Sequence, residues 1–374
     1  MKPDFPPELA DVLAERALSL LRVNSVIGQE RELADHMEAW ARQHFSPDEI
    51  VRQSHSFVLG TANDTRPSIA LVGHLDTVPP PAAPNPVRRE GERIYGLGSS
   101  DMKGGLAVMM QLAESLRRET LPVNVLWVFY EREEGPYAES GLPALFEAAP
   151  HLLRARFAVA LEPTDSVIQV GCVGSLHARV VFSGTAAHSA RPWQGVNAIH
   201  RAGDLLVRLS QRAPRIVRQG AFEFSEVISA TRANGGQARN VIPDRFELNL
   251  NYRFAPGKSV AQAEADLRAF VGSDADVDIT DRAPSGRVCD DNPFFQAFVQ
   301  SSGLPVAAKQ AWTDVARFAE HGVDAVNFGP GETAQAHQAK ESAPVSALAT
   351  ACEKLAAFLI ACDVPVTFSS GRAP

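Results

Sequence analysis

Two adjacent glutamates, Glu133 and Glu134, stand just beyond an apolar run that is typical of a buried β-strand, with only Glu131 and Arg132 between. The run covers residues 123–130 and ends in Leu, Trp, Val, Phe and Tyr side chains. Neighbouring carboxylates repel each other, and each costs free energy to desolvate. A lone pair of glutamates is usually a solvated loop, so the alternative, that a cation binds here, depends on the rest of the chain.

Further polar residues stand at the ends of other apolar runs or in a glycine-rich turn. His74 and Asp76 follow the apolar stretch IALVG, Glu162 ends the run FAVAL, and Asp101 lies in the glycine-rich turn GLGSSDMKGG. Each has an ordinary explanation when taken singly, such as a turn, a cap or the end of a strand. Because the carboxyl ends of parallel strands meet at one edge of a sheet, we expect these side chains to converge. An imidazole among carboxylates suits Zn²⁺, Co²⁺ or Mn²⁺. His337, after the predicted strand VNFG, can supply a second imidazole.

The elements that must position these residues alternate between strands and helices. This pattern over residues 1–174 and 284–374 predicts one discontinuous catalytic domain of the α/β class, with a mainly parallel sheet flanked by helices. Residues 175–283 change to alternating strands with two amphipathic helices, which predicts an inserted α+β domain of the ferredoxin-like kind. We therefore expect two domains, one of them inserted into the other.

The composition excludes several classes of protein. The 374 residues carry a net charge of −8 without a basic stripe, so we expect neither nucleic acid nor an anionic membrane as a partner. The sequence contains no apolar run of about 18 residues and no signal-like start. Its four cysteines form no CxxC pair, which is typical of a reducing compartment. We expect a cytoplasmic protein.

Five motifs in order, GHLDTVP, GSSDMKGG, EREEG, LEPT and AHQAKE, resemble the dinuclear zinc amidohydrolase family, which includes aminoacylases, carboxypeptidase G-type enzymes and desuccinylases. The resemblance runs from about residue 65 to residue 360. It implies two divalent ions, zinc with cobalt or manganese as alternatives. It assigns one ion to His74 and Glu162 and the other to Glu134 and His337, with Asp101 bridging both.

The resemblance also implies catalytic roles. Glu133 would be the general base, and Asp76 would hydrogen-bond His74 and fix its tautomer. His188, in GTAAHSARP, would stabilise the developing oxyanion and would reach the site from the partner subunit of a homodimer. The inserted domain would then serve as the dimerisation and lid domain.

Three longer stretches after residue 170, which begin with GCVGSLHARVV, ARNVIPDRF and QAWTDVARF, are similar to desuccinylases of the actinobacterial type. They imply a small N-acyl amino acid substrate, N-succinyl-L,L-2,6-diaminopimelate, with Arg253 and Asn240 in contact with it. Proteobacterial desuccinylases often carry an arginine where this chain has Val173, so the succinyl contacts do not transfer directly.

Three alternatives remain at this point. An N-acetylornithine deacetylase or a carboxypeptidase-like hydrolase would share the metal ligands and differ only in the substrate pocket. A family member that has lost catalysis is disfavoured, because all five ligands and Glu133 are present. A nucleotide-binding protein is disfavoured because the GxGxxG and Walker spacings are absent.

Overall fold

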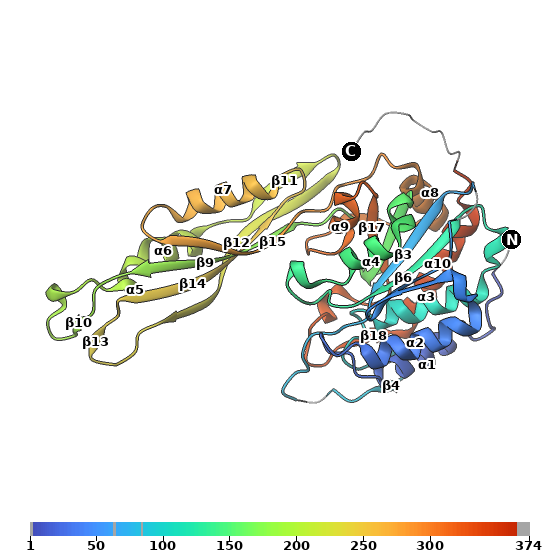
Figure 1. The fold of residues 1–374 in the computed structure, drawn as a ribbon, viewed down its shortest axis with the longest axis horizontal. Coiled ribbons are helices and arrows are strands. Elements are labelled where there is room, and N and C mark those ends of the chain that lie inside the picture. The colour runs from blue at the N-terminus through green and yellow to red at the C-terminus, as the bar shows by residue number, and fades with distance from the viewer. Residues whose placement is uncertain (1–2, 63–64, 84, 365–374) are drawn as a thin grey trace. The chain divides into compact units, whose positions relative to one another are not determined.

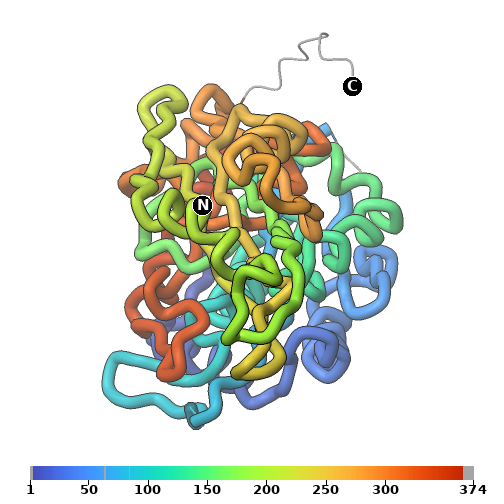
Figure 2. The backbone as a smooth tube through the Cα atoms, turned by 90° about the vertical axis from the view of Figure 1, so that its left-hand side faces the viewer, coloured from blue at the N-terminus to red at the C-terminus, as the bar shows by residue number. Residues whose placement is uncertain are grey.

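Two compact units make up the chain in the computed structural model, which describes residues 3–62, 65–83 and 85–364. The first unit comprises Met1–Val170, Cys289–Ala307 and Arg317–Pro374, and the second comprises Gly171–Val288 and Ala308–Ala316. In Figure 2 the long stretch of the second unit is the green-to-orange part of the tube. The sequence predicts an insertion at 175–283, and the structure extends this unit by a few residues at each end and adds residues 308–316.

An eight-stranded sheet forms the centre of the first unit, with strand order β1-β2-β6-β3-β7-β17-β8-β16. The four central strands are parallel, and the pairs β1–β2, β2–β6 and β17–β8 are antiparallel. All residues of the four central strands are buried, which explains why the sequence shows continuous apolar runs there and no alternation. The strands are β1 (Ile50–Gln53), β2 (Ser56–Leu59), β3 (Ser68–His74), β6 (Asn124–Tyr130), β7 (Phe157–Pro163), β8 (Ile168–Val170), β16 (Val306–Ala308) and β17 (Ala325–Gly329).

Helices flank this sheet (Figure 1). Helix α3 contacts β3 and β7, α10 contacts β17, and α1 packs on both α3 and α10, whereas α4 contacts β1 and β2. The helices are α1 (Leu9–Leu21), α2 (Arg31–His44), α3 (Lys103–Ser115), α4 (Leu142–Ala148), α8 (Pro293–Ser302), α9 (Val315–Glu320) and α10 (Val345–Ala361). A small sheet of β18 (Ser342–Pro344), β5 (Arg93–Tyr95) and β4 (Arg88–Glu90) completes the unit.

The start of α3 lies very close to the end of β7. A Cβ atom added at Gly105 would stand 2.6 Å from the backbone oxygen of Leu161, so only glycine allows this approach. The second glycine of the MKGG stretch therefore has a packing function. It brings the turn that carries Asp101 next to the strand that carries Glu162.

The second unit is an antiparallel sheet with order β11-β12-β14-β9-β15. Without the edge strand β11, the order β12-β14-β9-β15 and the placement of the helices are those of a ferredoxin-like fold. The elements are β9 (Gly174–Ser183), α5 (Ala198–Arg201), α6 (Gly203–Gln211), β11 (Arg215–Gln219), β12 (Phe222–Gly235), β14 (Arg245–Phe254), α7 (Val260–Val271) and β15 (Asp276–Ala283), with the short pair β10 (Ala187–His188) and β13 (Val241–Ile242). The expected fold class, a mainly parallel α/β sheet with an inserted α+β domain, is confirmed.

Within residues 3–62, 65–83 and 85–364, every helix is either too short or too polar to cross a bilayer.

Candidate metal centre

The register of the parallel strands places the predicted site residues side by side. Val72 of β3 pairs with Ala160 of β7, so His74 and Glu162, two residues further along, end their strands at the same level. His74 also pairs with Tyr130, the last residue of β6, and Glu133 and Glu134 follow just beyond. The expected convergence at the carboxyl edge of the sheet therefore results directly from strand order and register.

Three overlapping groups of potential ligands lie at this edge, and two of them share Asp101. His74, Asp101 and Glu162 form the first, and Asp101, Glu134 and His337 form the second; in each group the donor atoms lie within 4.8 Å of one another. The Nε2 atom of His74 lies 3.1 Å from Oδ1 of Asp101 and 4.0 Å from Oε1 of Glu162. On the other side, Nε2 of His337 lies 3.0 Å from Oε1 of Glu134 and 3.6 Å from Oδ2 of Asp101. Asp101 thus belongs to both groups, through different oxygens.

Glu133 belongs to neither of the two groups that share Asp101. It forms the third group with His74 and Glu134, in which the donor atoms also lie within 4.8 Å of one another. Its side chain is half-buried, so a substrate could reach it. The two neighbouring glutamates therefore stand in different positions relative to the ligand groups, which the sequence alone could only suggest.

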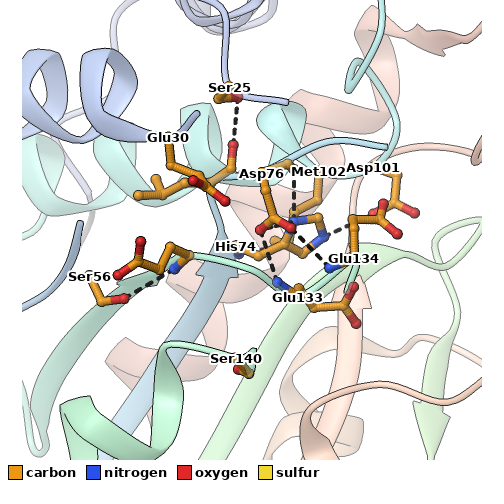
Figure 3. Close-up of polar contacts among 12 residues, drawn as sticks. Ser25, Glu30, Ser56, His74, Asp76, Asp101, Met102, Glu133, Glu134 and Ser140 are labelled. Atoms are coloured by element: carbon orange, nitrogen blue, oxygen red, sulfur yellow. Dashed lines mark hydrogen bonds and ion pairs between the residues drawn. The ribbon is translucent and has the colours of Figure 1, made fainter. Parts of the chain in front are cut away.

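Asp76 fixes the backbone of the two glutamates. Its carboxylate oxygens accept hydrogen bonds from the backbone N–H groups of Glu133 (3.0 Å) and Glu134 (2.9 Å), as the dashed lines in Figure 3 show. Nδ1 of His74 lies 3.0 Å from the backbone oxygen of Asp76 and 3.6 Å from its carboxylate. The closer partner of the imidazole is thus the Asp76 carbonyl, which leaves Nε2 directed at Asp101.

The charges at this edge shift several pKa values. Burial by itself lowers the pKa of His74, but its contacts with Asp101 and Asp76 outweigh burial and raise that pKa well above its usual value. The hydrogen bond with Glu134 raises the pKa of His337 to about 9. Burial, and then the charge of Asp101, raise the pKa of Glu134. The site as a whole therefore favours added positive charge.

The donor set fits a pair of divalent cations. Each group offers one imidazole nitrogen and two carboxylates, which is a common ligand combination for zinc and its neighbours. A carboxylate shared through both oxygens is also what two adjacent cations need as a bridge. The five residues fit the metal pair that the sequence resemblance implies, and we keep their role as ligands as a proposal.

The remaining predicted residues lie in the second unit. β10 pairs with β13 there, placing His188 opposite Val241, and the backbone oxygen of Asn240 accepts a hydrogen bond from the N–H of Ser189 at 2.9 Å. His188 is exposed, and its Nδ1 accepts the N–H of Ala190. The structure therefore brings His188 and Asn240 together at one end of this unit.

Arg253 stands elsewhere in the second unit, near the end of β14. It is half-buried, and its Nε donates to Oδ1 of Asn251 at 2.9 Å. Val173, at the position that departs from the proteobacterial pattern, is buried in a small core with Phe224 and Ala255. Its side chain thus has a packing role, and Arg253 is the basic residue that we retain for substrate.

One residue of the site escaped the sequence analysis. Glu341 ends the AHQAKE motif, and its buried carboxylate accepts hydrogen bonds from three backbone N–H groups of the turn that carries Asp101. Its position four residues after His337 was visible in the sequence. Its partners, about 240 residues earlier in the chain, were not.

A carboxylate-rich edge with one buried and one exposed imidazole, on a mainly parallel sheet, is the arrangement expected of a metal-dependent hydrolase. The chain belongs to the family described as peptidase family M20/M25/M40, whose model matches residues 70–361. It is thus a metal-dependent amidohydrolase of this family.

Several relatives within the family are named as enzymes that remove an acyl group from an amino acid. A Mycobacterium tuberculosis protein, named provisionally as succinyl-diaminopimelate desuccinylase DapE, is 39% identical over 92% of this chain and 97% of its own length. The succinyl-diaminopimelate desuccinylase of Corynebacterium glutamicum is 33% identical over 89% of this chain and 91% of its own. The acetylornithine deacetylase of Myxococcus xanthus is 32% identical over 86% and 87%.

Solved structures share the fold. An M20 family metallo-carboxypeptidase from Sulfolobus solfataricus superimposes with a TM-score of 0.76 at 15% identity, covering 93% of this chain and 98% of that chain. YxeP from Bacillus subtilis, described as a dinuclear metal-binding peptidase of the M20 family, gives a TM-score of 0.66 at 17% identity, covering 94% and 97%. The architecture of this chain is therefore that of the family over nearly its full length.

Proposed function

We propose that this chain hydrolyses the amide bond of N-succinyl-L,L-2,6-diaminopimelate, releasing succinate and L,L-2,6-diaminopimelate, for lysine and cell-wall synthesis in the cytoplasm. The observation that carries the chemistry is the pair of ligand groups that share Asp101, with Glu133 beside them. The substrate follows from the two relatives at 39% and 33% identity, both of which carry the desuccinylase name.

The proposed ligands are His74 and Glu162 for one ion and Glu134 and His337 for the other, with Asp101 shared. Bound divalent ions, with zinc as our first candidate, would polarise the amide carbonyl and make a water molecule acidic enough to ionise near neutral pH. All other steps belong to side chains of the protein.

Glu133 is the proposed general base. Its carboxylate takes a proton from the attacking water and then delivers that proton to the nitrogen of the departing amine, so the base is regenerated as the amide bond breaks. Asp76 keeps Glu133 and Glu134 in place, because it holds both of their backbone N–H groups. This arrangement lets one glutamate bind metal while its neighbour transfers protons.

Arg253 is the proposed partner of a substrate carboxylate. A guanidinium binds a carboxylate through two parallel hydrogen bonds, and Arg253 uses Nε for Asn251, which leaves its terminal nitrogens for a ligand. Asn240 would contact the same substrate, and His188 would donate to the oxyanion from the partner subunit of a homodimer. Closure of the second unit as a lid belongs to the same proposal.

An acetylornithine deacetylase is the competing function, because Val173 replaces a basic residue and a relative with that name is 32% identical. The test is to incubate the zinc-loaded enzyme with N-succinyl-L,L-diaminopimelate and, in parallel, with N-acetyl-L-ornithine. Amide cleavage is then measured for each substrate. A strong preference for the succinyl substrate supports the proposal, whereas a preference for the acetyl substrate replaces it with the deacetylase.

A further inference from the structure

A buried carboxylate outside the ligand set connects two segments that carry ligands. Glu341 is 1% exposed, and it lies four residues after His337. Its Oε2 accepts the backbone N–H of Gly98 at 2.7 Å, and its Oε1 accepts those of Ser100 at 2.8 Å and Asp101 at 3.0 Å. One side chain thus holds three backbone amides of the turn that presents Asp101.

The backbone of Glu341 strengthens the same connection. Its carbonyl oxygen accepts the N–H of Gly96 at 3.2 Å, and its own N–H donates to the carbonyl of Gln338 at 3.2 Å. The first contact joins Glu341 to the turn before Asp101, and the second joins it to the loop that follows His337. Hydrogen bonds of Glu341 therefore connect the turn that carries Asp101 with the loop that follows His337.

Hydrogen bonds to backbone amides offset part of the cost of burying this carboxylate, and burial still raises the pKa of Glu341 to about 7. Within the described residues, no lysine, arginine or histidine forms an ion pair with Glu341, so the three amides are the donors that compensate for its lost hydration. A hydrogen bond to a charged group contributes more than one between neutral groups, and a buried charged group that loses its partner destabilises the fold by a comparable amount. An apolar side chain at this position would leave three buried backbone N–H groups without an acceptor, whereas a carboxylate satisfies all three.

The turn that Glu341 holds leaves little room for adjustment. Ser100 accepts the backbone N–H of Glu332 at its Oγ, and a Cβ atom added at Gly331 would stand 2.6 Å from that oxygen. Gly331 thus packs against one side of the turn, and Glu341 binds the backbone amides of the turn. The direction in which Asp101 leaves the turn depends on both contacts.

We propose that Glu341 is a positioning residue that holds Asp101 in register with His337, so that one carboxylate can serve both ions. This inference rests on the proposed metal centre. Glu341 itself is directed at backbone amides and binds no ion. Its loss should weaken the shared ligand first, and with it the ion assigned to Glu134 and His337, because that ion depends on both of the connected segments.

The decisive variant is Glu341→Gln. The amide oxygen of glutamine can still accept from Ser100 and Asp101, but its NH₂ group would face the N–H of Gly98, which is a donor facing a donor. The matched control is Glu131→Gln, because Glu131 is also buried in the first unit and accepts a backbone N–H, that of His55 at 3.1 Å. The control removes a buried carboxylate and leaves the Asp101 turn intact.

Metal content and zinc affinity are measured by elemental analysis and by competition with a chelating dye, and the unfolding midpoint of each metal-free protein is recorded. We expect Glu341→Gln to bind its second zinc ion about 10–100-fold more weakly than wild type, in the range found when the partner of a metal ligand is removed. Glu131→Gln should keep both affinities even if its midpoint falls equally. Wild-type affinity for both ions in Glu341→Gln would overturn the inference.

Two further measurements keep the test decisive. If Glu341→Gln does not fold, hydrogen exchange of the wild-type metal-free protein is followed in a peptide that covers residues 96–102. Protection of the Gly98, Ser100 and Asp101 amides supports the inference, and exchange as fast as in an open loop contradicts it. A wild-type protein that binds fewer than two ions would instead refute the proposed dinuclear centre itself, which separates the two failures.

Discussion

The two carboxylate oxygens of Asp101 face two different imidazoles. Oδ1 lies 3.1 Å from Nε2 of His74, and Oδ2 lies 3.6 Å from Nε2 of His337. These histidines follow strands that are far apart in the sequence, and only the turn before α3 places a carboxylate between them. A single residue therefore connects the two halves of the proposed centre.

Asp101→Asn should affect both ions at once. The amide keeps one oxygen but loses the negative charge and the second acceptor, so it cannot bridge two cations. We expect bound metal to fall below two ions per chain and turnover to fall by at least about 10³-fold, a loss that combines ligand and charge effects. Elemental analysis after gel filtration checks this expectation. Two tightly bound ions in Asp101→Asn would contradict the bridging role.

Glu133 and Glu134 provide a matched pair, because they are neighbours of the same type with different proposed roles. Glu133→Gln should keep both ions and lose about 10²–10⁴ in turnover, the usual contribution of general acid–base catalysis. Glu134→Gln should lose affinity for the ion that it shares with His337, and added zinc should restore part of its activity. Steady-state kinetics at several zinc concentrations distinguishes the two. Undiminished turnover in Glu133→Gln would remove it from the mechanism.

Asn251 should orient the guanidinium of Arg253 for binding a substrate carboxylate. Oδ1 of Asn251 accepts from Nε of Arg253, and Nδ2 of Asn251 donates to Oγ of Ser175 at 3.1 Å, so the guanidinium is oriented by a fixed partner. We expect Asn251→Ala to raise KM for an N-succinyl amino acid about tenfold, the size of about one hydrogen bond. KM for the N-acetyl analogue, which lacks the acyl carboxylate, should stay unchanged.

The control for this prediction lies on the same strand. Asn249 contacts Thr231 and His177 and lies two residues before Asn251, without a hydrogen bond to Arg253. Asn249→Ala should leave both KM values near those of the wild type. An equal rise in KM for succinyl and acetyl substrates in Asn251→Ala would show that Arg253 does not recognise the acyl carboxylate.

Lys258 should be important for the stability of the second unit. It lies 3.0 Å from the carboxylate of Glu226, which is 1% exposed and also accepts from Tyr252 and from the N–H of Ala255. Lys258→Met removes the nearer cation of this carboxylate and leaves only the exposed Arg215, 3.8 Å away, so we expect a loss of up to about 3–5 kcal/mol in the free energy of unfolding. Urea denaturation measures it. The double variant Lys258→Met/Glu226→Gln should recover at least half of the loss, and failure to recover would mean that the pair is not the cause.

The pH dependence of this pair follows from the same contacts. Burial lowers the pKa of Lys258, but its hydrogen bonds with Asp266, Tyr252 and Glu226 outweigh burial and raise that pKa above its usual value. A raised lysine pKa means that the stabilisation is fully present below the unfolded-state pKa of about 10.4 and is lost as pH rises through the higher folded-state value. The difference in stability between wild type and Lys258→Met should thus be constant from pH 7 to 9 and shrink only above this range.

Much of the fold could be predicted because the local signals agree with it. The continuous apolar runs that form β3, β6 and β7 are buried on both faces, and the predicted polar residues lie at or within four residues of their carboxyl ends. The first of the two amphipathic helices that the sequence predicts within residues 175–283 is divided in the structure into α5 and α6, which are separated at Ala202. Helical periodicity continues across such a short break, so the sequence pattern could not locate it.

The sequence by itself determined which side chains end the central strands, because burial on both faces of a parallel sheet requires unbroken apolar runs and leaves the polar residues at their ends. The tertiary structure alone decided what those residues contact. Asp76 holds the backbone of Glu133 and Glu134, and Glu341 holds the turn of Asp101 across about 240 residues of sequence. Such contacts depend on the path of the loops between distant strands, and no local pattern of residues encodes that path.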